Sequence, residues 1–124
     1  MQRTSDIDLW REFAGTLADA ARPIAKHYFG MALTAHRKAD DSPVTRADRE
    51  AEMAMRALIE SSYPAHGIYG EEFGIREGSS DYVWVLDPID GTKSFITGRP
   101  LFGTLIALLE GGVPRVGVVD FPAL

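Results

Sequence analysis

The sequence contains no cysteine among its 124 residues. Neither a disulfide framework nor a thiolate nucleophile can therefore be built from it, which fits a reducing compartment. Long apolar runs are also lacking, and no segment approaches the roughly 20 apolar residues that a membrane-spanning helix needs. The first residues carry Asp6 and Asp8 where a signal peptide would be apolar. We expect a cytoplasmic protein that has no membrane partner.

Basic residues are too few and too scattered to form a basic stripe. The chain has 13 Lys and Arg against 18 Asp and Glu, for a formal net charge of −5. This balance argues against non-specific binding of nucleic acid. The apolar content of 45% is ordinary for a globular protein, and the length suits one small domain or part of a larger one.

Apolar residues at spacings of three and four predict a long helix from Ser5 to about Gly30. Ser5 with Asp8 can cap its start, and Gly30 can end it. Pro23 lies inside the pattern and predicts either a kink or a junction between two helices. The apolar stripe itself is interpreted as a packing face.

A second helix is expected from about Thr45 to Ser62, with Thr45 and Asp48 as a capping box. It follows a polar loop, His36–Val44, that Pro43 holds extended. The strand candidates after it are Ile68–Glu71, Tyr82–Leu86, Phe102–Leu109 and Arg115–Val119.

The last two strand candidates flank Glu110–Pro114, which is a hairpin signal, and Gly74–Asp81 is expected to be a loop. Two helices followed by several strands predict an α+β fold, with both helices packed on one face of a largely antiparallel sheet. The sequence stops at Leu124 just after a strand. We expect from this that a carboxy-terminal half is absent.

The segment from Trp84 to Phe95 carries the most chemical information. An apolar strand is expected to deliver Asp87 at its end, and Pro88 would stiffen the turn before Asp90. Gly91 permits a sharp turn and close backbone approach. Thr92 can begin a short helix whose free N–H groups, with that of Gly91, would suit a phosphate.

Two carboxylates at this spacing repel each other unless a cation sits between them. Oxygen ligands without His or Cys favour Mg²⁺, Mn²⁺ or Ca²⁺ over zinc. The alternative is an ordinary turn, since Asp-Pro and Asp-Gly are both common in turns, and the pair alone would favour that alternative.

Two further acidic elements shift the balance towards a metal site. Glu71 and Glu72 follow Gly70 at another strand end, and Asp40-Asp41 precedes the second helix. Taken singly, these elements are also consistent with solvated surface glutamates and with a polar loop leading into a helix cap.

Together, Gly70–Glu72 and Asp87–Thr92 resemble the paired signature of the inositol-monophosphatase family, in the family's order and approximate spacing. Lys38–Thr45 with Ala47-Asp48 also matches, and the resemblance extends to Val119. It implies that residues 1–124 are the amino-terminal metal-binding part of a phosphatase domain. The implied fold is the amino-terminal part of a layered αβαβα sugar-phosphatase-like fold.

The resemblance implies a role for each matching residue. Glu71 and Asp87 would bind the first metal together with the Ile89 carbonyl, and Asp87 would bridge to a second metal that Asp90 also holds. The cofactor would be Mg²⁺, as two or three ions in the complete enzyme, with Mn²⁺ as an alternative.

The remaining roles concern phosphate and water. Gly91 and Thr92 would contact the substrate phosphate, and Thr92 would act with an upstream aspartate to orient the attacking water. Asp40 is the aspartate assigned to that role. Glu72 would contact the residues that bind the metal, without binding the metal directly.

Lys93-Ser94-Phe95-Ile96 followed by Arg99-Pro100 is most similar to the histidinol-phosphate phosphatase branch. That branch hydrolyses L-histidinol phosphate to histidinol and phosphate in histidine biosynthesis. Inositol-1-phosphate and adenosine 3′,5′-bisphosphate are the alternative substrates. The implied partners are a small phosphorylated metabolite and, in the complete enzyme, a second copy of the chain.

One departure from the family matters for activity. The family's remaining second-metal carboxylate lies in a later Trp-Asp segment, whereas the tryptophans here, Trp10 and Trp84, precede Arg11 and Val85. The second metal site and the specificity pocket are therefore incomplete in this sequence. A truncated paralogue that binds metal or phosphate without turnover is the alternative hypothesis.

Overall fold

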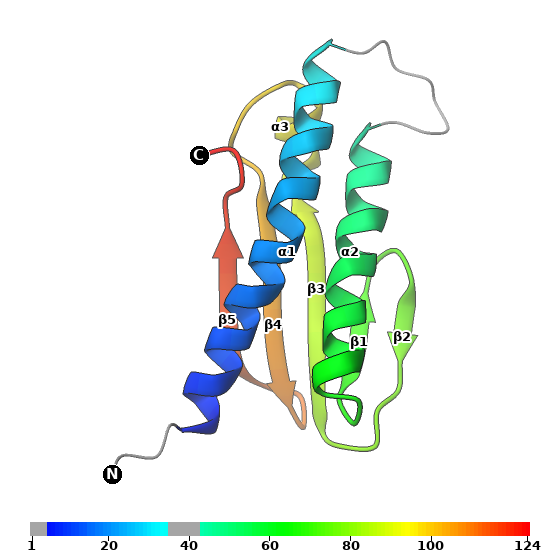
Figure 1. The fold of residues 1–124 in the computed structure, drawn as a ribbon, viewed down its shortest axis with the longest axis vertical. Helices are drawn as coiled ribbons and strands as arrows, with labels where there is room; N and C mark the ends of the chain where they lie inside the picture. The colour runs from blue at the N-terminus through cyan, green and yellow to red at the C-terminus, as the bar shows by residue number, and fades with distance from the viewer. Residues whose placement is uncertain (1–4, 35–42) are drawn as a thin grey trace.

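The computed structural model describes residues 5–34 and 43–124 (Figure 1). The elements in chain order are α1 (Asp6–Thr34), α2 (Pro43–Ser62), β1 (Gly67–Gly70), β2 (Gly74–Arg76), β3 (Tyr82–Asp90), α3 (Thr92–Ile96), β4 (Gly103–Glu110) and β5 (Val113–Asp120).

The long helices α1 and α2 lie side by side across one face of a five-stranded sheet (Figure 1). The strand order is β2-β1-β3-β4-β5, and three of the four neighbouring pairs are antiparallel. The predicted α+β class, with helices packed on a largely antiparallel sheet, is confirmed. The sheet is nevertheless mixed, because β1 and β3 run parallel.

The first helix is one continuous element that contains Pro23. The predicted alternative of two helices joined at Pro23 is therefore wrong, and the helix also runs past Gly30 to Thr34. Its predicted start is confirmed, since the Asp8 N–H donates to the Ser5 hydroxyl oxygen at 3.2 Å. Packing of its apolar face outweighs the hydrogen bond that proline cannot make.

The second helix begins at Pro43, earlier than the predicted start at Thr45. Proline suits the first helical position because the N–H that it lacks would have no partner there. The earlier start places Thr45 and Asp48 within the helix, so the predicted capping box is wrong. This shift matters for the site described below.

The core lies between the helices and the sheet, and it consists of two clusters. In the larger cluster, alanines of α1 and α2 pack near Trp84, Leu86 and Ile106 of the sheet. Small side chains let the two helices approach the sheet closely while the larger strand residues fill the space. The smaller cluster lies where β3 meets α3, and it comprises Ala25, Val44, Ala47, Ile89, Phe95 and Phe102.

The predicted hairpin is confirmed as β4 and β5, joined by Gly111 and Gly112, both with positive φ. Two strand predictions were wrong. Residues Gly74–Arg76 form β2 inside the predicted loop, and β3 continues to Asp90 where a turn was expected after Leu86. A register shift between Asp87 and Asp90 allows the strand to continue through Pro88.

The face of the sheet opposite α1 and α2 carries apolar side chains. Residues that alternate with the core positions point there, among them Val85, Leu105 and Val119. In the part of the chain that the structure describes, no helix covers this face (Figure 1). No helix in residues 5–34 or 43–124 combines the length and apolarity needed to cross a membrane.

Candidate metal and phosphate site

The parallel pairing of β1 with β3 brings two acidic segments together. Gly70 of β1 is paired with Leu86 of β3. Glu71 is the residue after Gly70, and Asp87 is the residue after Leu86. Parallel neighbours run in the same direction, and their carboxyl ends therefore meet at one edge of the sheet. The structure thus places Glu71 beside Asp87, two residues that the sequence assigned to one metal.

The end of β3 holds Asp87, Ile89 and Asp90 in the irregular stretch of the strand. Ile89 is buried, while Asp90 is exposed at the strand end. The Thr104 hydroxyl donates to the Pro88 carbonyl at 2.9 Å and ties the irregular stretch to β4. A strand end anchored in this way can hold carboxylates at fixed positions.

Gly91 joins β3 to α3 with φ of 90° and ψ of 46°, which is the left-handed region that favours glycine. A Cβ at this position would also lie 3.1 Å from the Leu101 carbonyl oxygen. Thr92 is the first residue of α3 and is exposed. The sharp turn and short helix predicted here are confirmed, with Phe95 anchoring the helix in the core.

Asp48 is a site residue that the sequence interpretation missed. It projects from α2, and burial raises the pKa of its carboxyl to about 7, with Glu72, Asp87 and Glu71 adding to the rise. A hydrogen bond with the Ile89 backbone acts in the opposite direction. The sequence did not distinguish Asp48 from a helix-capping aspartate, because its burial depends on how α2 packs against the sheet.

Asp87 has a carboxylate oxygen with no partner. Its Oδ1 atom is buried and accepts no hydrogen bond within the described part of the chain. Burial raises the pKa of Asp87, and the charges of Asp90 and then Glu71 raise it further. An unpaired buried carboxylate oxygen is costly, and this cost would be relieved by a cation.

Glu72 lies on the surface directly after Glu71. Partial desolvation of the carboxyl raises its pKa, Glu52 and then Glu71 add to the rise, and Arg49 opposes it. Its backbone N–H donates to Oε1 of Glu52 at 3.1 Å. The buried Glu52 is the second residue that the sequence interpretation overlooked.

The donor chemistry at this sheet edge fits a hard divalent cation. All the side-chain donors are carboxylate oxygens, as Mg²⁺ and Ca²⁺ prefer, and the neighbouring negative charges contribute to the raised pKa of Asp48 and of Asp87. No three His, Cys, Asp or Glu side chains of residues 5–34 and 43–124 converge closely enough to hold a metal. Asp40 lies outside the described residues.

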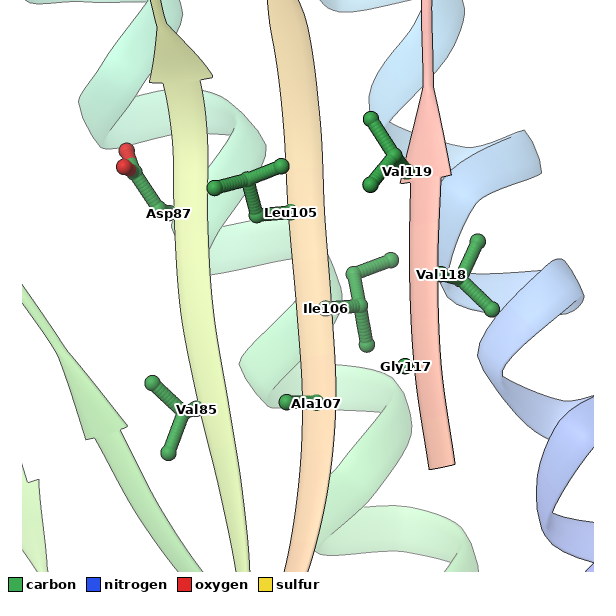
Figure 2. Close-up of a pocket in the computed structure, with 8 residues that line it drawn as sticks. All are labelled: Val85, Asp87, Leu105, Ile106, Ala107, Gly117, Val118 and Val119. Atoms are coloured by element: carbon green, nitrogen blue, oxygen red, sulfur yellow. The ribbon is translucent and has the colours of Figure 1, made fainter. Parts of the chain in front are cut away.

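A shallow hollow of about 460 Å³ lies on the sheet face away from the long helices, next to Asp87 (Figure 2). Asp87 is the single charged residue among the eight that line it, and β3, β4 and β5 supply the rest. This hollow is therefore an apolar surface that reaches the acidic edge of the sheet.

A family model described as the inositol monophosphatase family matches residues 6–124. The chain therefore belongs to the inositol monophosphatase family, as the acidic signature indicated.

Curated relatives include the chloroplastic bifunctional phosphatase IMPL2 of Arabidopsis thaliana, which is 52% identical over 97% of this chain and 35% of that protein. The histidinol-phosphatase of Chlorobaculum parvum is 44% identical over 98% of this chain and 46% of that protein. Among solved structures, an inositol monophosphatase from Zymomonas mobilis superposes with a TM-score of 0.81 at 48% identity. That match covers 96% of this chain and 46% of the solved chain. The chain thus spans less than half of the length of these relatives.

Proposed function

We propose that residues 1–124 form the amino-terminal metal-binding part of a Mg²⁺-dependent phosphatase for small phosphate monoesters. The observation that carries this proposal is the parallel pairing of β1 with β3. It places Glu71 beside Asp87, whose buried Oδ1 atom has no partner in the described chain. Family membership supports the same reaction class.

Four groups at the sheet edge would hold the metal, with Mg²⁺ first and Mn²⁺ as the alternative. They are the carboxylates of Glu71, Asp87 and Asp90 and the carbonyl of Ile89. When bound, such an ion supplies a Lewis acid that lowers the pKa of a bound water and offsets charge on the phosphoryl oxygens.

The other residues of the site would handle phosphate and water. The backbone N–H groups of Gly91 and Thr92 would face the substrate phosphate. The Thr92 hydroxyl would orient the attacking water together with an aspartate. Asp40 was assigned to that role from the sequence, and Asp48 joins it as a candidate because it shares the acidic edge with Glu71 and Asp87.

L-Histidinol phosphate is the substrate we propose first. Several of the relatives are named histidinol-phosphatases, including one from Mycobacterium tuberculosis that is 47% identical over 87% of this chain. Lys93-Ser94-Phe95 after the acidic motif supports the same choice. Inositol-1-phosphate and adenosine 3′,5′-bisphosphate are the competing substrates. We further infer that the complete protein is a homodimer, as the family resemblance implies.

Phosphate release from these three esters by the complete gene product tests the proposal. We expect turnover that requires Mg²⁺, is abolished by a chelator and is fastest with L-histidinol phosphate. Faster turnover of either competitor would correct the substrate and keep the reaction class. Mg²⁺ binding without release from any ester would instead favour the non-catalytic paralogue.

A further inference from the structure

A fully buried carboxylate, that of Glu52, lies beneath the turn between β1 and β2. Its Oε1 atom accepts the N–H of Glu72 at 3.1 Å, and its Oε2 atom accepts the N–H of Phe73 at 2.9 Å. These are the two residues that directly follow Glu71. The Glu52 side chain of α2 therefore fixes the backbone directly after Glu71.

Arg56 completes this arrangement from one helical turn further along α2. Its Nε–H donates to Oε2 of Glu52 at 3.0 Å, and its guanidinium also donates to the Gly74 carbonyl. The same guanidinium lies 5.9 Å from the centre of the Phe73 ring. Glu52 thus binds the beginning of the turn while Arg56 binds its end.

The strand before the turn is shaped to fit this carboxylate. A Cβ at Gly70 would lie 2.4 Å from the carboxyl carbon of Glu52, so the Glu52 carboxylate would have to move away from its present position. Glycine at this position lets β1 pass directly over the buried carboxylate. On the far side of the turn, Gly74 has φ of 72°, which suits the reversal into β2.

A contribution to the stability of the fold does not by itself explain the Glu52–Arg56 ion pair. A buried ion pair often contributes less to stability than well-packed apolar side chains of the same volume. Glu52 also adds negative charge next to carboxylates that already repel one another, since it raises the pKa of Glu72. Its hydrogen bonds, in contrast, are directed at the turn that carries a predicted metal ligand.

We propose that Glu52 and Arg56 are positioning residues that fix the β1–β2 turn so that Glu71 meets Asp87, and thereby set the affinity of the cation site. This inference rests on the proposed function. Neither residue would touch the metal or the substrate. Their effect would reach the site through the backbone of residues 71–74.

The test compares Mg²⁺ affinity by calorimetry in Glu52→Gln and in the unaltered complete gene product. The amide keeps the shape of the side chain, but its NH₂ group faces a donor and one hydrogen bond is lost. We expect Mg²⁺ affinity to fall about ten- to a hundredfold, as for other residues that support metal ligands. The Mg²⁺ concentration needed for phosphate release should rise in parallel, while KM for the ester stays unchanged.

Glu60→Gln is the matched control, because Glu60 is an exposed glutamate of α2 that pairs with Arg76, at the end of β2 away from the turn. Its Mg²⁺ affinity should equal that of the unaltered protein. Where Glu52→Gln does not fold, as judged by circular dichroism, Arg56→Lys decides. Lysine keeps the charge but cannot reach Glu52 and Gly74 together, so Mg²⁺ affinity should again fall.

A folded Glu52→Gln protein with Mg²⁺ affinity within about twofold of the unaltered protein would overturn the inference, since supporting residues act well beyond that range. The same holds for Arg56→Lys where it is the deciding variant. In either case the proposed function stands if the unaltered protein binds Mg²⁺ and releases phosphate. An unaltered protein that does neither would overturn both.

Discussion

Asp87 places a buried carboxylate oxygen without a hydrogen-bond partner, within the described chain, at the sheet edge. This atom is Oδ1, and burial and then the charges of Asp90 and Glu71 raise the pKa of the carboxyl. The proposed role gives this atom a cation as its partner. Substitution of Asp87 should therefore affect metal binding more than folding.

We expect Asp87→Asn to lower Mg²⁺-dependent turnover of the complete gene product by roughly a hundredfold or more, because a shared anionic ligand is lost. Mg²⁺ affinity, measured by calorimetry, should fall with it, whereas the thermal unfolding temperature should not fall. Asp81→Asn, at an exposed residue directly before the same strand, serves as the control. Normal turnover and metal affinity in Asp87→Asn would remove this residue from the site.

Thr92 is an exposed residue at the start of α3. We expect Thr92→Ala to lower kcat by about a hundredfold while KM changes little, because a hydroxyl that orients water acts on the transition state. Steady-state kinetics of the complete gene product measure both parameters. An effect confined to KM would make Thr92 a binding residue only.

The aspartate that acts with Thr92 can be identified by the same assay. If Asp48 has this role, Asp48→Asn should reproduce the kcat loss of Thr92→Ala, and Asp40→Asn should leave kcat unchanged. A loss of kcat in Asp40→Asn but not in Asp48→Asn would show that Asp40 acts with Thr92.

His66 lies directly before β1, at the opposite end of this strand from Glu71, in an aromatic cluster with Tyr63, Tyr82 and Trp84. Its Nδ1 accepts the Trp84 indole N–H at 3.0 Å, and burial lowers its pKa. The folded state therefore favours the neutral ring, and its stabilising effect is complete above the ordinary histidine pKa. This effect should be lost as the pH falls below about 6.5.

We expect the thermal unfolding temperature to decrease between roughly pH 7.5 and 5.5 more in the unaltered protein than in His66→Gln. Glutamine can still accept the Trp84 N–H but does not titrate. Asp48, whose pKa is raised to about 7, protonates in the same pH range and stabilises the folded state as the pH falls. The contribution of His66 is therefore measured as the difference between the two curves. Parallel curves would show that His66 does not contribute.

At the scale of elements, two glycines differ in what limits their replacement by alanine. Gly15 lies within α1 with nothing within 4 Å of an added Cβ, whereas Gly91 has φ of 90° and is close to the Leu101 carbonyl oxygen. The same substitution should therefore have opposite effects at the two positions.

We expect Gly15→Ala to raise the free energy of unfolding by about 0.5–1 kcal/mol, because alanine favours the helix. Gly91→Ala should lower it by about 1–3 kcal/mol, because a side chain is strained in the left-handed region. Chemical denaturation measures both. Equal effects would contradict the backbone geometry assigned to the β3–α3 junction.

At the scale of the whole molecule, the two faces of the sheet differ in their cover. α1 and α2 cover one face (Figure 1). The other face presents apolar side chains including Tyr69, 51% exposed, and Val119, 56% exposed. Such a face is typical of a surface that packs against further protein. This agrees with the proposal that residues 1–124 are part of a larger phosphatase domain.

We expect a preparation of residues 1–124 alone to bind Mg²⁺ weakly, to hydrolyse phosphate monoesters negligibly and to self-associate through the uncovered face. The sequence holds Asp87 and Asp90 but not the later carboxylate that the family resemblance assigns to the second metal. Light scattering and phosphate release measure these properties. Robust Mg²⁺-dependent turnover by a verified monomer would contradict this expectation.

The sequence alone determined the elements whose periodicity is strong and local. The apolar spacing of α1, the glycines of the β4–β5 hairpin and the α+β class were all predicted, because each depends on near neighbours in the chain. The acidic signature also identified the family, since Glu71, Asp87 and Asp90 are recognisable by order and spacing.

Only the tertiary structure decided which of these residues meet. The parallel pairing of β1 with β3 depends on contacts between distant segments, and it is this pairing that sets Glu71 beside Asp87. Asp48 and Glu52 were missed for the same reason. On a helix, a capping carboxylate, a surface carboxylate and one aimed at a strand end look alike in sequence, and packing against the sheet distinguishes them.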